Sequence, residues 1–593
     1  MSANGLQSFA FHRHEQSDVV DAIRPIVGFD MPLPDGRPAI AGIDPETAAR
    51  RYLAEAFASP ALPTFNTPEI DGQSSEFRTL GTESVPLTGT HVVKFRQVYR
   101  RIPVYGSLVT VELDENNEML GLNSSMGTPP ADLDPMATLS PAQAMDIIRQ
   151  RAGQDAQSLN ALPRLVFYFQ EPAQRWLLAY LVENVARRQP DTSAGAMRRA
   201  PELLDYLVDA HSGNLIAELP RTQSIQGPDH QPDLQSPQGL GPSQQLLFRR
   251  KRQAPQFEEA PDGLGVRRKF AAKKKGEAWQ LVDDELNVHT YDFGYHDLER
   301  EDKLLPGSYV ARPPEWDPAA VSAHANAVEV VLFLRKVLKR EGLDNRGGPV
   351  ISSINCCYGG LGHKEWHNAA WIGTQMVYGQ RALDGSRMRS YAVARDVVAH
   401  EILHGLTDHS ARLEYAGMSG ALNESYSDIF GIIVSNLTNP DVGTWNWEMG
   451  EDLNDSGIPI RDISDPEKYG QPGHMDDYEF LAVGPNTDWG GVHTNSGIHN
   501  KAAYHLLTAK DAQGQFLFDA REVAALFYLA LTQHLSRTSK FIDSRRGVEL
   551  SARTFFRNDP RQKEKLAAIG AAFDAVGITS NLGVTFEPQK LSS

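Results

Sequence analysis

Alternation of hydrophobic and polar residues predicts β-strands across much of the first half of the chain. Alternate residues from Val93 to Tyr99 fall on one face of an extended run, because side chains two positions apart point to the same side of a strand. Residues 109–113 repeat this alternation, and residues 114–117 supply the acidic and amide side chains that are typical of turns. We therefore expect neighbouring strands joined by a turn in this region.

Helix start signals flank the strand-like runs. Asp44 is a good N-cap and is followed by proline at the first helical position. Ser140, Pro141 and Gln143 form a capping-box start to a second helix. Strand-like runs then follow at residues 165–169, 176–182 and 203–216. One helix followed by several hairpin strands predicts a compact α+β module here.

A larger domain is expected from Trp279 onward. A strongly apolar helix is predicted to begin at the cap Asp317 and to end at Gly342. Strand-like material follows it, and the sequence becomes mostly helical after Asp396. The whole chain therefore belongs to the α+β class, and it contains no internal repeat.

The segment between residues 225 and 276 is expected to be a linker. Its first part is dominated by proline, glycine and glutamine, and ten basic residues against three acids follow between positions 249 and 275. A flexible connector is one interpretation, and an exposed stretch that proteases process is the other.

Composition narrows the possible functions. The 593 residues exceed one ordinary domain, and 75 acids against 58 lysines and arginines give a net charge of −17, which argues against general binding of nucleic acids. No apolar run is long enough for a transmembrane helix. The first 25 residues lack the pattern of a standard secretory signal. The two cysteines, Cys356 and Cys357, are adjacent, and we interpret them as thiols at a strand end or as a vicinal redox pair.

The segment RDVVAHEILHGLTDH carries the candidate chemistry. His400 and His404 are four residues apart, so on a helix both imidazoles project from one face and can reach one metal ion. Glu401 lies one step round the helix, where it can take a proton from a water whose pKa zinc has lowered. An amphipathic helix with surface histidines is the alternative interpretation.

A second helical segment, GALNESYSDIFG, strengthens the metal hypothesis. Glu424 can provide a third ligand and leave one position open for water and substrate, as a catalytic zinc requires. Asp428 lies one turn further along the same face and can orient a ligating histidine through its second ring nitrogen.

The order HEILH then NESYSD resembles the thermolysin family of zinc endopeptidases, which have the gluzincin pattern of two histidines and a downstream glutamate. Further matching segments are HNAAWIGTQMVYG (367–379), IPIRDISDPEKYG (458–470), TDWGGVHTNSGIHNKAAYHL (487–506) and AAIGAAFDAVGI (567–578). The resemblance implies a two-lobed catalytic domain, with a β-rich N-terminal lobe, a helical C-terminal lobe and the zinc helix between them.

The resemblance also implies a role for each matching residue. His400, His404 and Glu424 would bind one Zn²⁺, with Glu401 as general base. Tyr415 and His493 would stabilise the oxyanion, and Asp428 and Asp488 would orient the two histidines His400 and His493. Asn368, Ala369 and Arg461 would bind the substrate backbone.

Two further features follow from the same resemblance. An apolar pocket for the residue after the cleaved bond would be lined by Met388, Tyr391, Val397, Met449, Leu453 and Ile460, which predicts cleavage on the amino side of bulky hydrophobic residues. The family's calcium site retains Asp396, Glu448, Glu451 and Asp452, whereas Ser435 and Asn446 stand where the family has acids. Loss of two carboxylates weakens a site for a hard cation, so we expect one weakly bound Ca²⁺ or none.

The N-terminal half resembles modules that precede such catalytic domains. We expect an N-terminal segment (1–75), a fungalysin/thermolysin-type propeptide module (76–130), a PepSY-like module (138–222), the linker with its basic processing region (225–276) and the metallopeptidase domain (277–593). The propeptide would act as an intramolecular inhibitor of a monomeric enzyme.

The sequence thus predicts a latent zinc endopeptidase that acts on peptides and proteins. Alternatives are a gluzincin aminopeptidase, although no segment resembles a motif that grips a free amine, and a non-catalytic binding or inhibitory protein on the same scaffold. The family resemblance implies an extracellular location; the first 25 residues leave a non-standard export route or a cytoplasmic precursor as alternatives.

Overall fold

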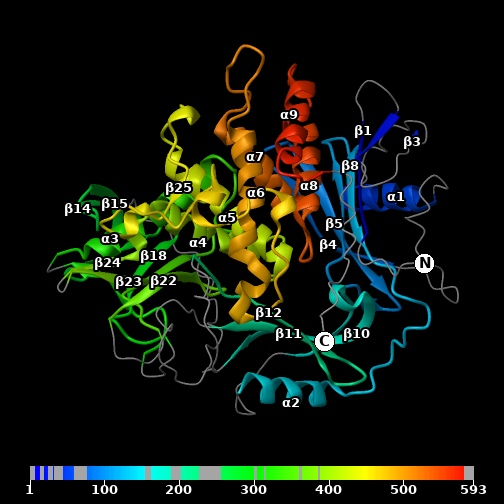
Figure 1. Ribbon diagram of the computed structural model, residues 1–593, viewed down its shortest axis with the longest axis horizontal. Coiled ribbons are helices and arrows are strands. Elements are labelled where there is room, and N and C mark those ends of the chain that lie inside the picture. The colour runs from blue at the N-terminus through cyan, green and yellow to red at the C-terminus, as the bar shows by residue number, and fades with distance from the viewer. Residues whose placement is uncertain are drawn as a thin grey trace.

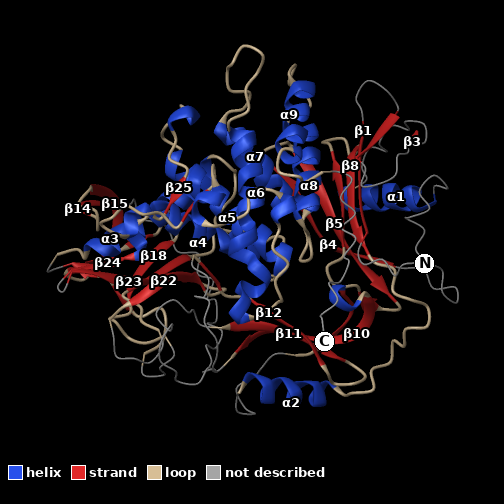
Figure 2. Cartoon of the chain, in the orientation of Figure 1, coloured by secondary structure: helices blue, strands red, loops and turns tan. Residues whose placement is uncertain are grey.

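The protein consists of two N-terminal α+β modules that pack against a two-lobed C-terminal domain (Figure 1). The computed structural model describes residues 7–13, 19–23, 31–32, 44–58, 76–153, 162–187, 202–225, 256–298, 303–312, 315–358, 364–384 and 387–579. The prediction of an α+β fold with a β-rich lobe followed by a helical lobe is confirmed (Figure 2).

The first module is an antiparallel sheet with one helix on its face. The sheet runs in the order β3-β2-β1-β8-β7-β5-β4, and β6 pairs with β5. Alternate residues of its central strands form a core with helix α1, which begins after the predicted cap Asp44. The elements are β1 (Gln7–Arg13), β2 (Val19–Ile23), β3 (Met31–Pro32), α1 (Pro45–Ala58), β4 (Glu76–Val85), β5 (Thr90–Tyr99), β6 (Ile102–Pro103), β7 (Leu108–Leu113) and β8 (Met119–Met126).

The second module is a four-stranded antiparallel sheet in the order β12-β11-β10-β9 with helix α2 beside it. The predicted capping box is confirmed, because Ser140 Oγ accepts the Gln143 N–H while the Gln143 side chain accepts the Ser140 N–H. Its elements are α2 (Pro141–Ala152), β9 (Arg164–Gln170), β10 (Arg175–Ala186), β11 (Leu203–Asp209) and β12 (Leu215–Pro220).

The β-rich lobe contains two sheets and the long helix α3 (Pro318–Lys336). One sheet runs in the order β13-β22-β23-β21-β18-β17, with β19 and β24 attached, and the other in the order β14-β15-β16-β20. Their strands are β13 (Gln223–Ser224), β14 (Gln256–Pro261), β15 (Arg267–Lys275), β16 (Ala278–Gln280), β17 (Val282–Asp283), β18 (Val288–Asp292), β19 (Ser308–Tyr309), β20 (Ala311–Arg312), β21 (Val350–Ile354), β22 (Trp366–Trp371), β23 (Met376–Asp384) and β24 (Arg387–Ser390).

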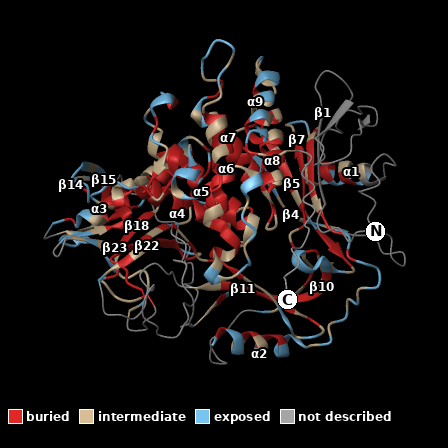
Figure 3. Ribbon diagram, viewed as in Figure 1, coloured by how far each residue is buried: buried red, intermediate tan, exposed pale blue. Residues whose placement is uncertain are grey.

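The helical lobe continues the same hydrophobic core. Helices α4 and α5 lie at its centre and are buried along most of their length (Figure 3). No helix among the described residues is both long enough and apolar enough to cross a membrane. The elements of this lobe are α4 (Arg395–Asp408), α5 (Gly417–Asn436), β25 (Glu448–Met449), β26 (Arg461–Asp462), α6 (Asp488–Leu507), α7 (Ala520–Leu529), α8 (Phe541–Phe555) and α9 (Gln562–Asp574).

Two sequence-based boundaries differ from the structure. The predicted linker 225–276 contains a β-hairpin, β14–β15, whose Phe270 is 2% exposed and packs in the core of the β-rich lobe. Basic residues at both ends of β15 are mostly exposed and flank the buried run Phe270–Ala272, so the composition of this segment is that of a connector. The helix predicted to reach Gly342 ends at Lys336, and Gly342 adopts a positive φ of 71° in the turn beyond it.

The N-terminal modules dock on the helical lobe at several points. Glu112 of β7 accepts a hydrogen bond from Thr554 of α8, at 2.9 Å. Lys94 of β5 donates to the Thr532 carbonyl at 2.6 Å. Trp489, at the start of α6, packs against the core formed by α2, β10 and β11. The two modules therefore cover the lobe that carries the candidate site.

Candidate active site

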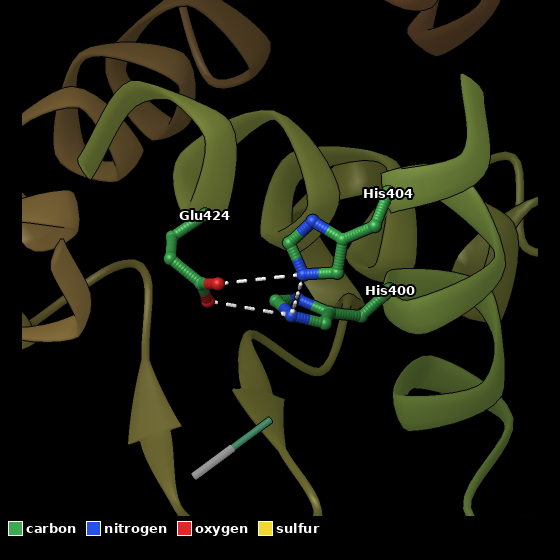
Figure 4. Close-up of side chains that lie close together, drawn as sticks. All are labelled: His400, His404 and Glu424. Atoms are coloured by element: carbon green, nitrogen blue, oxygen red, sulfur yellow. Dashed lines mark hydrogen bonds and ion pairs between the residues drawn. The ribbon is translucent and has the colours of Figure 1, made fainter. Parts of the chain in front are cut away.

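Helix α4 brings His400 and His404 together, as the spacing predicted. Both side chains are 0% exposed, and their Nε2 atoms lie 3.0 Å apart (Figure 4). The helix is buried on nearly every side, so these polar side chains are not part of an amphipathic surface. Because the two Nε2 atoms are buried away from water, they need a common partner to interact with.

Glu424 of α5 completes a compact triad with the two histidines. Its Oε2 lies 3.4 Å from His400 Nε2, and its Oε1 lies 3.3 Å from His404 Nε2. A tetrahedral zinc with ligands at about 2.0–2.1 Å separates its ligand atoms by about 3.3–3.4 Å. Within the described residues, these three side chains form the group whose ligand atoms can hold a metal ion. The donor set and its spacing fit Zn²⁺.

The Nδ1 atoms of both histidines lie close to side-chain oxygens of helix α5. His400 Nδ1 lies 2.7 Å from Asp428 Oδ1, the contact that the sequence predicted. His404 Nδ1 lies 3.0 Å from Asn423 Oδ1 and 3.1 Å from Ser427 Oγ, and neither partner was predicted. These contacts leave both Nε2 atoms directed at the metal position, because they fix which ring nitrogen carries the proton.

Glu401 lies beside the triad on the face of α4 toward strand β22. Its Oε2 accepts the Trp371 N–H at 3.1 Å, whereas its Oε1 accepts no hydrogen bond from any described residue. Burial raises the pKa of Glu401 to about 8, with Glu424 adding to the rise and His400 opposing it. Such a carboxylate can accept a proton near neutral pH and release it again.

A tight turn at the start of α6 positions His493. Four consecutive residues from Asp488 to Gly491 have positive φ values between 49° and 92°, and glycine accommodates this backbone most readily. The turn returns Asp488 to its own helix, where Oδ1 lies 2.6 Å from His493 Nδ1 and Oδ2 accepts the His493 N–H at 2.8 Å.

His493 and Tyr415 lie beside Glu424 of the triad. The Tyr415 hydroxyl donates to Glu424 Oε1 and lies 3.2 Å from His493 Nε2. Burial lowers the pKa of His493, but the carboxylates of Glu424 and Asp488 outweigh it and raise the pKa to about 9. The ring can therefore donate two hydrogen bonds at neutral pH, one to Asp488 and one into the cleft.

Strand β13, which the sequence did not predict, crosses this cleft. It pairs antiparallel with β22, with Gln223 opposite Trp371 and Ser224 opposite Ala370. The Ser224 carbonyl lies 2.7 Å from His493 Nε2. The chain's own backbone therefore occupies the site as an added strand, a common mode of peptide binding.

The residue after β13 is held by two of the predicted substrate-binding residues. Arg461 Nη2 donates to the Ile225 carbonyl at 3.0 Å, and the Ile225 N–H points to the Ala369 carbonyl at 3.4 Å. Asn368 is buried on the same strand, and its Oδ1 accepts the Ala369 N–H at 2.9 Å.

A pocket of about 390 Å³ opens beside Ile225, with Leu453 and Ile460 among its lining residues. Three of the other residues predicted for the pocket belong to the hydrophobic core that includes Ile225; they are Tyr391, Val397 and Met449. Met388 is 36% exposed and lies outside this core.

The acids of the predicted calcium site have partners within the chain. Asp396 Oδ2 accepts the Gly450 N–H at 2.7 Å, and Glu448 Oε1 lies 2.5 Å from Lys468 Nζ. Asn446 donates to Glu451 Oε1 at 2.5 Å. The other substituted position, Ser435, donates to the Gly431 carbonyl. Asp452 is half-buried, and burial raises its pKa. Weak or absent calcium binding stays a prediction.

Comparison with known proteins agrees with this geometry. The thermolysin metallopeptidase catalytic domain matches residues 260–408, the thermolysin metallopeptidase alpha-helical domain matches residues 411–578, and the fungalysin/thermolysin propeptide motif matches residues 75–126. The PepSY-like assignment of residues 138–222 stays a prediction.

Two related proteins and one solved structure are similar to this chain. Neutral protease B of Bacillus subtilis (strain 168) is 30% identical over 516 residues, which cover 85% of this chain and 85% of that protein. Bacillolysin of Bacillus amyloliquefaciens is 37% identical over 291 residues, which cover 48% of this chain and half of that protein's length. Among solved structures, the precursor of protealysin, a metalloproteinase from Serratia proteamaculans, is 28% identical with a TM-score of 0.41, covering 52% of this chain and 90% of that one. The chain belongs to the thermolysin metallopeptidase family.

Proposed function

We propose that the chain is a zinc endopeptidase that cleaves on the amino side of bulky hydrophobic residues and is made as a propeptide-inhibited precursor. The observation that carries this proposal is strand β13, which passes through the zinc site in the middle of the chain. A site that accepts backbone on both sides of the metal suits an endopeptidase. An aminopeptidase must instead bind a free amine at one end of its substrate.

The zinc ligands and Glu401 account for activation of the water that attacks the peptide bond. Zinc bound by His400, His404 and Glu424 would lower the pKa of a water molecule and polarise the substrate carbonyl. Glu401 takes a proton from the attacking water and later transfers one to the leaving amine.

The remaining groups hold the substrate and its developing charge. His493 and Tyr415 donate hydrogen bonds to the carbonyl oxygen as it becomes an oxyanion, and such a donor contributes about 3–4 kcal/mol to transition-state stabilisation. Asp488 and Asp428 orient His493 and His400 through the contacts at 2.6 and 2.7 Å. Asn368, Ala369 and Arg461 align the peptide backbone along β22.

Inhibition by the N-terminal modules is supported by what β13 covers. Its backbone occupies the position where a substrate strand would pair, and Ser224 uses the hydrogen bond of His493. A peptide substrate can bind only after this segment has left. We further propose that the mature enzyme is monomeric and extracellular, as the family resemblance implies; sedimentation of the purified enzyme and immunodetection in culture medium test these points.

The experiment that tests the proposed activity is hydrolysis of a furylacryloyl-blocked peptide with leucine after the cleaved bond. Activity should be lost with a zinc chelator and regained with added Zn²⁺. The blocking group separates the candidate functions, because an aminopeptidase cannot act on a blocked N-terminus. Activity that resists the chelator would contradict the zinc mechanism, and cleavage of unblocked peptides alone would favour an aminopeptidase.

A further inference from the structure

We propose that Arg381 makes this enzyme prefer substrates that carry an acidic side chain two or three residues after the cleaved bond. The inference rests on the proposed function and adds to it a second requirement on the substrate, beyond the bulky hydrophobic residue. It is carried by the charges that line the pocket beside Ile225 and by the direction of the strand that crosses the site.

The charges around the pocket beside Ile225 have one sign. Three of its lining residues are basic, namely Arg381, Arg461 and His493, and none is an aspartate or a glutamate. The remaining lining residues are glycines or have apolar or uncharged polar side chains. A cleft lined by charges of one sign attracts groups of the opposite sign. The lining therefore favours a negatively charged substrate group over a positively charged one.

Two of the three basic residues already have carboxylate partners inside the catalytic site. Arg461 Nε lies 3.5 Å from Asp428 Oδ1, and His493 Nδ1 lies 2.6 Å from Asp488 Oδ1. These two side chains also have assigned tasks, because Arg461 holds a substrate carbonyl and His493 faces the oxyanion. Arg381 of β23 has no such task, and it is the basic lining residue whose charge is available to a substrate side chain.

The acid of the neighbouring loop is taken by other arginines. Strand β24 pairs antiparallel with β23, and Arg389 lies directly opposite Arg381. Asp455 Oδ1 lies 2.8 Å from Arg389 Nη2, and Asp455 Oδ2 lies 3.4 Å from Arg387 Nη2. Among the ion pairs of the described residues, none joins Arg381 to a carboxylate within 4.0 Å. The cross-strand arginines thus leave an excess of positive charge at this edge of the sheet.

Glu365 is the described acid whose charge interacts with Arg381, and it has partners of its own. Its Oε2 accepts the Ala382 N–H at 2.9 Å and lies 2.7 Å from His367 Nε2. The Ala382 N–H and His367 lower the pKa of Glu365, and the charge of Arg381 contributes less to this lowering. Glu365 therefore does not neutralise Arg381.

The strand register directs a substrate toward Arg381. The Ile225 N–H points to the Ala369 carbonyl, and β13 runs antiparallel to β22. A substrate strand in the same place would continue from there toward Trp366, the first residue of β22. Trp366 pairs with Gln380, the residue before Arg381. Because Arg381 also lines the pocket beside Ile225, its long side chain reaches back over the positions two and three residues after the cleaved bond.

A carboxylate suits this position better than a neutral amide does. A guanidinium donates two parallel hydrogen bonds to a carboxylate, which an amide side chain cannot accept in the same way. Arg381 is partly exposed, so salt should weaken the interaction. The preference should lie between the small value of an exposed ion pair and the larger value of a desolvated one, about 5–20-fold in kcat/KM.

The test compares furylacryloyl-blocked peptides that share leucine after the cleaved bond and carry glutamate, glutamine or lysine at the second or the third position after it. The purified chain in Zn²⁺ should cleave the glutamate peptide about 5–20-fold more efficiently than the glutamine peptide at one of these positions. The lysine peptide should be the poorest of the three, and the preference should shrink as salt is added. Each ratio compares two peptides in one sample, so it does not depend on the fraction of chains that is active.

Variants assign the preference to one side chain. Arg381→Met should bring the ratio of the glutamate to the glutamine peptide close to one and leave cleavage of the glutamine peptide nearly unchanged. Arg381→Glu should reverse the order of the glutamate and lysine peptides. Arg387→Met is the matched control, because it removes the same charge from the neighbouring strand at a side chain that is 61% exposed and outside the pocket lining. The control should keep the preference.

Equal cleavage of the glutamate and glutamine peptides at both positions overturns the inference, and so does a preference that survives in Arg381→Met. A preference lost to the same extent in Arg387→Met would assign it to general surface charge and would also overturn the inference. All of these results leave the proposed function standing. Failure to cleave any of the blocked peptides contradicts the proposed function itself.

Discussion

Arg537 should be a principal anchor of the N-terminal modules, and its replacement by methionine should loosen them. Its guanidinium contacts Glu183 Oε1, lies 3.4 Å from Asp205 Oδ2 and is 13% exposed. Both acids belong to the second module. Burial raises the pKa of Glu183, but Arg537 and its neighbours Arg412 and Arg164 outweigh it and lower the pKa to about 2.

The size of the effect follows from the charges that would lose a partner. Removing one member of a buried ion pair costs about 3–5 kcal/mol. Arg412 remains 3.1 Å from Glu183, and Arg221 remains 4.0 Å from Asp205, so part of the compensation persists. We therefore expect docking of the modules to weaken by about 2–3 kcal/mol, which corresponds to about 30–150-fold in the docking equilibrium.

Hydrogen exchange measured by mass spectrometry tests this prediction in a Glu401→Gln background, where the chain should stay intact. Amides of residues 223–225 should exchange about 30–150-fold faster with Arg537→Met, because their partners lie on β22 of the catalytic domain and their protection requires docking. Arg267→Met is the control, since its pair with Glu259 is 71% and 55% exposed and exposed pairs contribute little. Unchanged exchange at 223–225 in a folded Arg537→Met protein would refute the reasoning.

Three further predictions concern the catalytic domain. Glu424→Ala should abolish metal retention, measured as zinc per chain after dialysis; an unchanged zinc content would show that Glu424 is not a ligand. His493→Ala should lower kcat for the blocked peptide about 10²–10³-fold with little change in KM; a change in KM alone would assign His493 to ground-state binding. Burial lowers the pKa of His324 from its usual 6.5 to about 4. Between pH 4 and 6.5 the folded state therefore binds fewer protons than the unfolded state. The free energy of unfolding should fall by about 3 kcal/mol as the pH drops from 6.5 to 4. Urea unfolding of the Glu401→Gln chain across this range should show that loss, and a His324→Gln variant with the same pH dependence would contradict it.

Local signals in the sequence were sufficient where one segment determines its own geometry. The spacing of His400 and His404 on one helix, and the capping box at Ser140, depend on residues three or four positions apart. Glu424 and Asp428 were found for the same reason, since they lie on one face of α5. The predicted roles of the individual site residues stay predictions until variants are measured.

Contacts between distant segments could not be predicted in the same way. Strand β13 pairs with a strand nearly 150 residues further along the chain, and its two residues carry no alternating pattern of their own. Asn423 was overlooked as the partner of His404, although its position directly before Glu424 placed it on the right helix. The hairpin β14–β15 could not be predicted because exposed lysines and arginines at both ends of β15 dominate its composition, and only the short run Phe270–Ala272 between them is buried.

The most direct test of the zinc endopeptidase assignment combines metal content with turnover in one pair of proteins. Zinc per chain and hydrolysis of the blocked peptide should be measured for the activated wild-type enzyme and for Glu401→Gln treated with a second protease to remove its N-terminal modules. We predict one zinc per chain in both proteins, with turnover lost in the variant. Turnover that survives in Glu401→Gln, or a wild-type enzyme that is active without zinc, would contradict the assignment.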